Sequence, residues 1–179
     1  MMVMNPTSND NPSIPLPKKT IIVVRGTMGV GKTKLCEELS KTLKDSFWLD
    51  GDCCWTMNPW VFSEENKAMV LSNIKHILRN FFENSSCKFI LFSWVLHDMD
   101  ILDDILAVLS NENYDLRIVT LTCSEKVLIS RLQKRERKDL IEKSIKHLSL
   151  YDEKDHGTLI IDTTNMTIDK TIERILNER

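Results

Sequence analysis

The residues best suited to chemistry lie in the segment GTMGVGKT, where three glycines precede a lysine and a threonine. The segment matches the pattern G-x-x-x-x-G-K-[ST] at Gly26, Gly31, Lys32 and Thr33. A backbone with little side-chain bulk can wrap around a polyphosphate and point several N–H groups inward. Lys32 adds a full positive charge, and the hydroxyl of Thr33 can ligate Mg²⁺. The pattern predicts a phosphate-binding loop made of Gly26, Thr27, Met28, Gly29, Val30, Gly31, Lys32, Thr33 and Lys34. The alternative is a glycine turn that merely joins a strand to a helix.

Two carboxylates follow the next apolar segment, in the sequence WLDGDCCW. Asp50 and Asp52 come at the expected carboxyl end of a strand, which is the edge where open parallel sheets bind ligands. A phosphotransferase needs a carboxylate to orient an acceptor hydroxyl and take its proton. Asp52 lies farther out of the strand and is the better base, whereas Asp50 suits a metal–water contact or a structural role. The alternative is a polar turn, because Asp and Gly are common turn residues.

A basic segment, RLQKRERK, occupies residues 131–138. Arg131, Arg135 and Lys138 are spaced to share one helical face. A kinase needs a cover that closes over the triphosphate and excludes water, since ATP would otherwise be hydrolysed. We expect Arg131 and Arg135 to serve in such a lid. The alternative is a solvated basic face paired with nearby glutamates.

The segment DCCWTMNPWVF carries several aromatic residues directly after the two aspartates. Trp55 and Trp60 offer flat faces that could stack on a ring of the acceptor. Packing over the following helix is the other interpretation. His97, which follows a later strand, is more typical of a surface or core histidine than of a catalyst.

Short β-branched or apolar runs alternate with helical patterns along the chain. The runs predict strands at 20–24, 47–50, 88–96, 115–123 and 158–163. The helical spacing predicts helices at 32–45, 63–84, 99–110, 124–137, 139–153 and 167–178. Ser63, Ser124 and Thr167 are candidate N-caps. This alternation predicts an α/β fold with a mostly parallel sheet and helices on both faces.

Bulk composition limits the partners. The chain has 179 residues, of which 42% are hydrophobic and 28% charged, and its net charge is −2. It fits one domain at 18–179, after a polar, proline-rich leader at 1–17 that we expect to be flexible. The slightly acidic balance argues against a general nucleic-acid binder, and no apolar run approaches a membrane span. The odd count of five cysteines, without C-x-x-C, favours free thiols and a cytoplasmic location.

The loop, LDGD (49–52) and LTCSEKVLISRLQKRER (121–137) together resemble the small P-loop kinases, including adenylylsulfate, gluconate and shikimate kinases and chloramphenicol phosphotransferase. The resemblance implies a three-layer P-loop fold with a five-stranded parallel sheet in the order 2-3-1-4-5. It also implies that Asp52 is the acceptor-side base and that Arg131 and Arg135 embrace the phosphates. LDGD is most similar to adenylylsulfate kinase, but CCWTMNPW replaces the arginine that usually follows.

Our leading hypothesis is an ATP- and Mg²⁺-dependent kinase of a small molecule, such as a nucleoside, a nucleotide, or an aromatic or antibiotic compound. Lys32, Asp52, Asp50, Arg131 and Arg135 would be catalytic, Thr33 and Asp50 would hold the metal, and Trp55 and Trp60 would hold the acceptor. Two alternatives stay open: a kinase of polynucleotide ends, and a nucleotide-binding regulator with little transferase activity. An [NT]-K-x-D guanine motif is missing, which favours ATP over GTP. The strand at 88–96 is followed by an acid only at Asp98, so the second metal contact is irregular.

Overall fold

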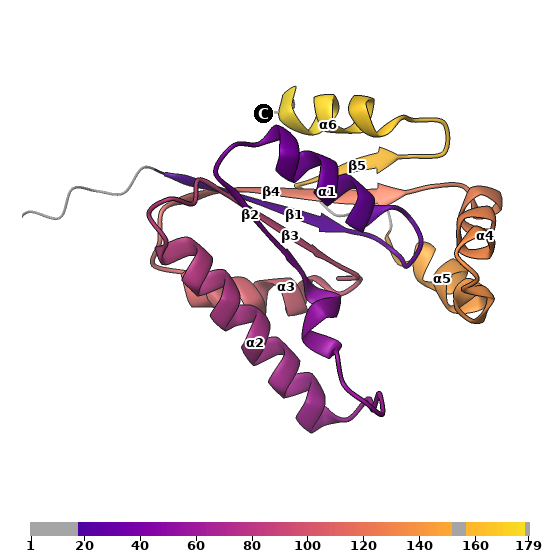
Figure 1. Ribbon diagram of the computed structural model, residues 1–179, viewed down its shortest axis with the longest axis horizontal. Coiled ribbons are helices and arrows are strands. Elements are labelled where there is room, and N and C mark those ends of the chain that lie inside the picture. Colours follow the sequence, from indigo (N-terminus) through magenta and orange to yellow (C-terminus); the bar gives the residue numbers. More distant parts are fainter. Residues whose placement is uncertain (1–17, 152–156, 178–179) are drawn as a thin grey trace, which may run out of the picture.

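The fold is built on five parallel strands (Figure 1). The computed structural model describes residues 18–151 and 157–177. The expected leader at 1–17 and residues 152 and 153 of the fifth expected helix lie outside the described residues. The strands lie in the order β2-β3-β1-β4-β5, which confirms the expected order. Their bounds are β1 Lys19–Arg25, β2 Ser46–Asp50, β3 Phe89–Trp94, β4 Tyr114–Thr122 and β5 Thr158–Asp162.

Helices cover both faces of this sheet. Figure 1 shows α1 and α6 on one face, α2 and α3 on the other, and α4 and α5 beyond the carboxyl ends of the strands. Three short 3₁₀ helices are also present in the described residues. Gly51–Trp55 follows β2, Ala107–Leu109 follows α3, and Lys138–Leu140 precedes α5. The α-helices are α1 Lys32–Thr42, α2 Glu64–Glu83, α3 Met99–Leu106, α4 Glu125–Lys134, α5 Ile141–Leu148 and α6 Ile168–Asn177.

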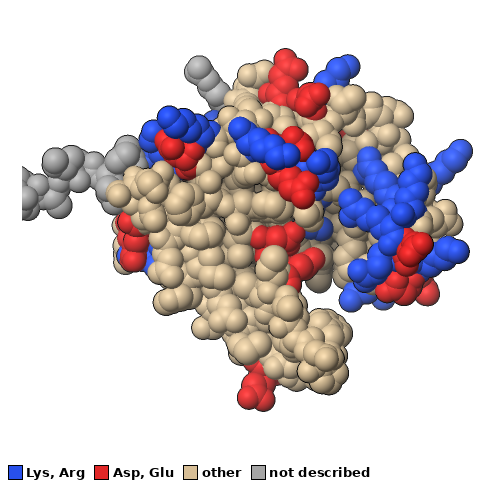
Figure 2. Space-filling view, in the orientation of Figure 1, with Lys and Arg blue, Asp and Glu red and all other residues tan. Residues whose placement is uncertain are grey.

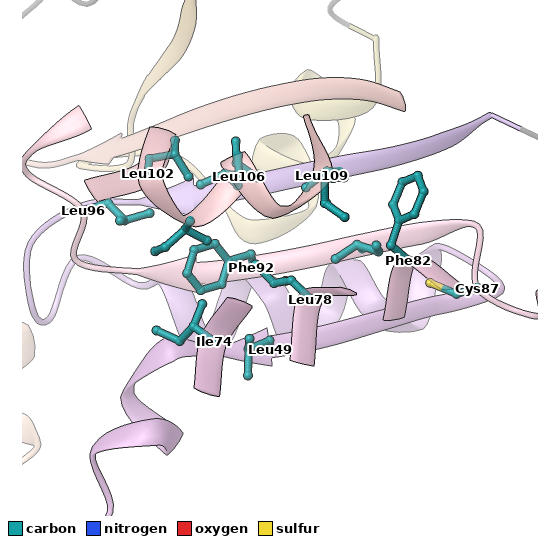
Figure 3. Packing of buried hydrophobic residues seen from close by; sticks show 14 of the residues in the cluster. Leu49, Ile74, Leu78, Phe82, Cys87, Phe92, Leu96, Leu102, Leu106 and Leu109 are labelled. Atoms are coloured by element: carbon teal, nitrogen blue, oxygen red, sulfur yellow. The ribbon is translucent and has the colours of Figure 1, made fainter. Parts of the chain in front are cut away.

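The central strand β1 is buried on both faces because its side chains alternate between two cores. Ile21 and Val23 point into the cluster under α2 and α3, and Ile22 and Val24 into the cluster under α1 and α6. Figure 3 shows the first cluster, in which Phe92 of β3 lies among side chains of the flanking helices. Burial on both faces explains why the sequence of this strand is continuously apolar.

Several expected boundaries were wrong by a few residues, for local reasons. β3 ends at Trp94, before Leu96 takes a φ of 34°. Asp98 then begins α3 by accepting a bond from the N–H of Asp100 at 3.0 Å. Ser63 caps α2 as expected, accepting from the N–H of Asn66. Ser124 occupies the N-cap position of α4, but its side chain makes no capping bond.

The helix expected at 124–137 ends at Lys134, so Arg131, Arg135 and Lys138 do not share one helical face. Arg135 is the C-cap, and Glu136 follows with a φ of 56°. This turn separates α4 from α5.

No helix within residues 18–151 and 157–177 has the length and apolar character needed to cross a bilayer. All five cysteines are free.

Candidate active site

The loop between β1 and α1 has the backbone that its glycines permit. Gly26, Gly29 and Gly31 have φ values of 147°, 82° and 118°, which side-chain-bearing residues rarely adopt. A Cβ at Gly26 would also lie 2.6 Å from the carbonyl oxygen of Leu121. The loop opens directly into the first turn of α1, whose free N–H groups favour an anion. Residues 26–33 therefore form a cradle at the carboxyl edge of the sheet.

Lys32 is folded against this cradle and almost completely buried. Its ammonium donates to the carbonyl oxygens of Gly26 at 2.8 Å and Thr27 at 3.1 Å. Burial lowers the pKa of Lys32 to about 8, against the opposing charges of Asp52 and Asp50. A lysine in this state gains most from a negatively charged ligand, because the anion restores the pKa that burial has depressed.

A chain of hydrogen bonds links the loop to the neighbouring strands. Thr33 Oγ1 donates to Asp50 Oδ2 at 3.1 Å, and Asp50 Oδ1 accepts from the Asp52 N–H at 3.2 Å. Asp52 Oδ1 in turn accepts from Trp94 Nε1 at 3.1 Å. Gly51 allows this arrangement, since a Cβ there would lie 2.6 Å from the Trp94 ring. Thr33, Asp50 and Asp52 thus form one polar network at the carboxyl ends of β2 and β3.

Asp52 is an exposed residue whose carboxylate is only partly shielded from water. Burial raises its pKa, and the negative charge of Asp50 adds to that effect, while Lys32 and the Trp94 N–H oppose it. A raised pKa makes a carboxylate a stronger proton acceptor. The hydroxyl of Thr33 and the carboxylate of Asp50 supply the hard oxygen donors that suit Mg²⁺, which takes its remaining ligands from phosphates and water. The donor set therefore fits that ion.

Aromatic side chains form the wall beside Asp52. Trp55 and Phe62 stack with ring centroids 5.6 Å apart, and Trp60 lies 5.9 Å from Trp55 and 6.2 Å from Phe62. Trp60 is 59% exposed and Phe62 61% exposed, although both are large apolar residues. The structure thus brings Trp55 and Trp60 together, with Phe62 as a third member that the sequence interpretation did not assign. Its signal was available in the same segment, two residues after Trp60.

The two arginines expected in the lid have different surroundings. Arg131 Nη1 donates to Val30 O at 2.7 Å and Thr163 Oγ1 at 3.0 Å, and its Nη2 donates to Thr163 O at 3.0 Å. Arg131 therefore ties α4 to the phosphate loop and to the segment after β5. Arg135 instead lines the cleft described below. A phosphate contact by either arginine stays a prediction.

A cleft of about 1020 Å³ joins the loop, Asp52 and the aromatic wall. Its lining includes Met28, Gly29, Gly31, Lys32, Thr33, Asp52, Trp55, Trp60 and Arg135 from the expected site. Gly26, Thr27, Val30, Lys34, Asp50 and Arg131 lie outside the lining. Lys34 pairs with Glu38 at 2.8 Å and Glu37 at 3.3 Å on the surface of α1. Figure 2 shows this hollow between the basic surface on one side and a largely uncharged projection on the other.

The cleft also has a wall from α5 that the sequence did not predict. Lys143 and His147 of α5 line it together with His97, whose ring centroid is 5.0 Å from that of His147. The Thr27 hydroxyl fastens the loop to this helix by donating to Ser144 O at 2.8 Å. The only signal for this wall in the sequence was the four-residue spacing of Lys143 and His147 on one helix. Their proximity to residue 97 comes from the tertiary fold.

Comparisons with known proteins agree with this fold. The profile of a family described as "AAA domain" matches residues 22–148, which is most of the 179-residue chain. The chain belongs to this AAA-domain family. A search of curated proteins finds no match.

Solved structures show the same fold at low sequence identity. A gluconokinase from Sinorhizobium meliloti 1021 is 18% identical with a TM-score of 0.64, over 90% of this chain and 91% of that one. A shikimate kinase from Acinetobacter baumannii, in complex with shikimate, is 19% identical with a TM-score of 0.60, over 90% and 92%. The APS kinase of Mycobacterium tuberculosis, in complex with AMPPNP and APS, is 17% identical with a TM-score of 0.61, over 90% and 97%. The expected resemblance to small P-loop kinases is confirmed, and the fold of this AAA-domain protein is theirs.

Proposed function

We propose that this AAA-domain protein is an ATP- and Mg²⁺-dependent kinase that transfers the γ-phosphoryl group to a small molecule bearing a hydroxyl. One observation carries the proposal: a single cleft is lined by both the phosphate-loop lysine, Lys32, and a carboxylate, Asp52. A phosphotransferase needs these two groups on opposite sides of the transferred phosphorus. A regulator that only binds nucleotide has no use for the second.

Each residue then has a role. The N–H groups of residues 26–33 and the ammonium of Lys32 would bind the β and γ phosphates, and Thr33 and Asp50 would hold Mg²⁺. The ion, when bound, neutralises charge on the phosphate oxygens. Arg135, and Arg131 if it leaves its partners in the loop, would meet the triphosphate from the α4 side. Lys34 would contribute only to the field around the loop.

In the proposed transfer, the acceptor O–H bond breaks and its proton passes to Asp52. The acceptor oxygen forms a bond to the γ-phosphorus as the bond between that phosphorus and the β–γ bridging oxygen breaks, and ADP leaves. Trp94 holds the Asp52 carboxylate in place, so the base does not have to be oriented during the step. The acceptor would lie beside Trp55 and Trp60, and the base of a nucleoside or another flat ring fits that wall.

The test is acceptor-stimulated ADP release, measured across nucleosides, nucleotides, sugars, antibiotics and oligonucleotides. We expect a small molecule to stimulate release, and Asp52→Asn to keep Mg·ATP affinity within about threefold while losing transfer about a hundredfold or more. Equal turnover by Asp52→Asn would contradict the assignment of the base. Stimulation by oligonucleotides alone would identify an end kinase, and nucleotide binding with no stimulated release would identify a regulator.

A further inference from the structure

The acceptor side of the cleft has a distinct chemical character, which bears on the substrate class of the proposed kinase. Trp55, Trp60 and Phe62 form one wall, and Trp94 and Ile101 continue it toward the sheet. Two of these rings, Trp60 and Phe62, are more than half exposed. Exposed apolar side chains that cluster at a cleft commonly mark a binding site, and flat rings are suited to stack on a flat ligand.

The charges of the cleft are divided between its two sides. Among the described lining residues, four basic side chains lie on the loop, α4 and α5 side, namely Lys32, Arg135, Arg137 and Lys143. One carboxylate, Asp139, lies on the same side and pairs with Arg137 at 3.3 Å. Figure 2 shows this basic surface facing the largely uncharged projection across the hollow. A bound triphosphate would meet these cations, since the phosphate loop lies on their side.

The acceptor side has the opposite balance among the described residues. Asp52 and Asp98 both line it, and the basic side chain it presents is Lys67. Lys67 of α2 already has a carboxylate partner, Glu64, at 3.8 Å. The carboxylate of Asp52 would repel a second anion placed beside it, because like charges that line one cleft are screened less than charges in bulk water. An anionic acceptor would therefore meet aromatic faces and carboxylates, and Lys67 is the only cation that the described lining residues place on that side.

We propose that the acceptor site takes flat, ring-bearing hydroxyl compounds that are neutral or positively charged, and that it discriminates against anionic ones. The flat ring stacks on the Trp55–Trp60–Phe62 wall, and the hydroxyl reaches Asp52. A positive group on the ligand gains from the aromatic faces and from the two carboxylates. This inference rests on the proposed function, because it assigns the acceptor half of the same cleft.

The experiment uses four probes that share a two-carbon or shorter arm. Indole-3-ethanol is neutral, tryptamine is cationic, indole-3-acetate is anionic, and 2-cyclohexylethanol carries the hydroxyl without a flat ring. Each is titrated into the full chain by calorimetry and saturation-transfer NMR, with and without Mg·ADP. The same titrations are run on Trp60→Ala, which shortens an exposed ring of the wall. Leu116→Ala is the matched control, because Leu116 is an exposed apolar residue on β4 outside the cleft lining.

We expect indole-3-ethanol and tryptamine to bind at least fivefold tighter than indole-3-acetate and 2-cyclohexylethanol. Trp60→Ala should weaken the two favoured probes at least threefold, and Leu116→Ala should leave them unchanged. The inference is overturned if indole-3-acetate binds within fivefold of indole-3-ethanol, if the cyclohexyl probe does so, if Trp60→Ala loses less than threefold, or if no indole binds. Mg·ATP binding is measured separately on the same samples. Loss of nucleotide binding there would contradict the proposed kinase activity without altering the ring and charge preferences.

Discussion

Raising the pH should weaken nucleotide binding through one group, Lys32. Burial lowers the pKa of this lysine to about 8, so its ammonium loses its proton well below the usual range for lysine. A pKa near 8 leaves about nine tenths of the side chains protonated at pH 7 and about one tenth at pH 9. A bound triphosphate favours the ammonium and raises its pKa again. The affinity for Mg·ATP should therefore be flat below about pH 7.5 and fall about tenfold between pH 7 and pH 9, which is about 1.4 kcal/mol.

Calorimetry in two buffers of different ionisation enthalpy measures both the affinity and the protons taken up. At pH 9, binding should take up close to one proton per nucleotide, and at pH 6.5 almost none.

Lys32→Arg should bind more weakly but lose the pH dependence, because a guanidinium stays charged throughout. Lys34→Ala should keep the wild-type profile, since the glutamates around Lys34 raise its pKa. Burial raises the pKa of the neighbouring Cys36 thiol to about 12, so that thiol does not titrate here. A fall of less than twofold, or an equal fall in Lys32→Arg, would refute this reasoning.

Two further outcomes follow from the hydrogen bonds of the site. Trp94→Phe removes the N–H that holds Asp52 and should lower kcat about tenfold with little change in the KM for ATP. The control is Trp48→Phe, which loses an indole hydrogen bond to Ser93 and should not lower kcat. Equal kinetics in the two variants would contradict the role of Trp94. Arg131→Lys breaks three hydrogen bonds to buried partners and should lower the free energy of unfolding by about 2 kcal/mol. Arg135→Lys should leave the free energy of unfolding unchanged within about 0.5 kcal/mol and should weaken phosphoryl transfer instead, because Arg135 lines the cleft. Chemical denaturation and steady-state kinetics check this pair, and an unchanged midpoint for Arg131→Lys would show that its bonds contribute little.

The sheet and the loop could be predicted because their signals are local. Alternating apolar runs and helical spacings predict a parallel sheet, and in such a sheet the carboxyl ends of all strands share one edge. Gly26, Gly31, Lys32 and Thr33 lie within eight consecutive residues, so one segment of sequence defines the phosphate cradle. Asp52 could be placed near it because it follows a strand of the same sheet.

The surroundings of single side chains could not be predicted, because they depend on distant segments. Regular spacing predicted that Arg131 and Arg135 share a face, but α4 ends between them and Arg131 bonds to Val30 and Thr163. Those partners are separated from it by 101 and 32 residues. His147 reaches the cleft for the same kind of reason, through the position of α5 over the loop. Burial, which depresses the pKa of Lys32, is likewise a property of the whole fold.

The central claim is that residues 26–33 hold the β and γ phosphates of a nucleoside triphosphate, and ³¹P NMR of Mg·ATP tests it most directly. Titration with the wild-type chain should shift or broaden the β and γ resonances in a saturable way, and Lys32→Ala should abolish most of that change. Two results would contradict the account: β and γ resonances that stay unchanged in the presence of folded wild-type protein, or equal changes with the wild-type protein and with Lys32→Ala.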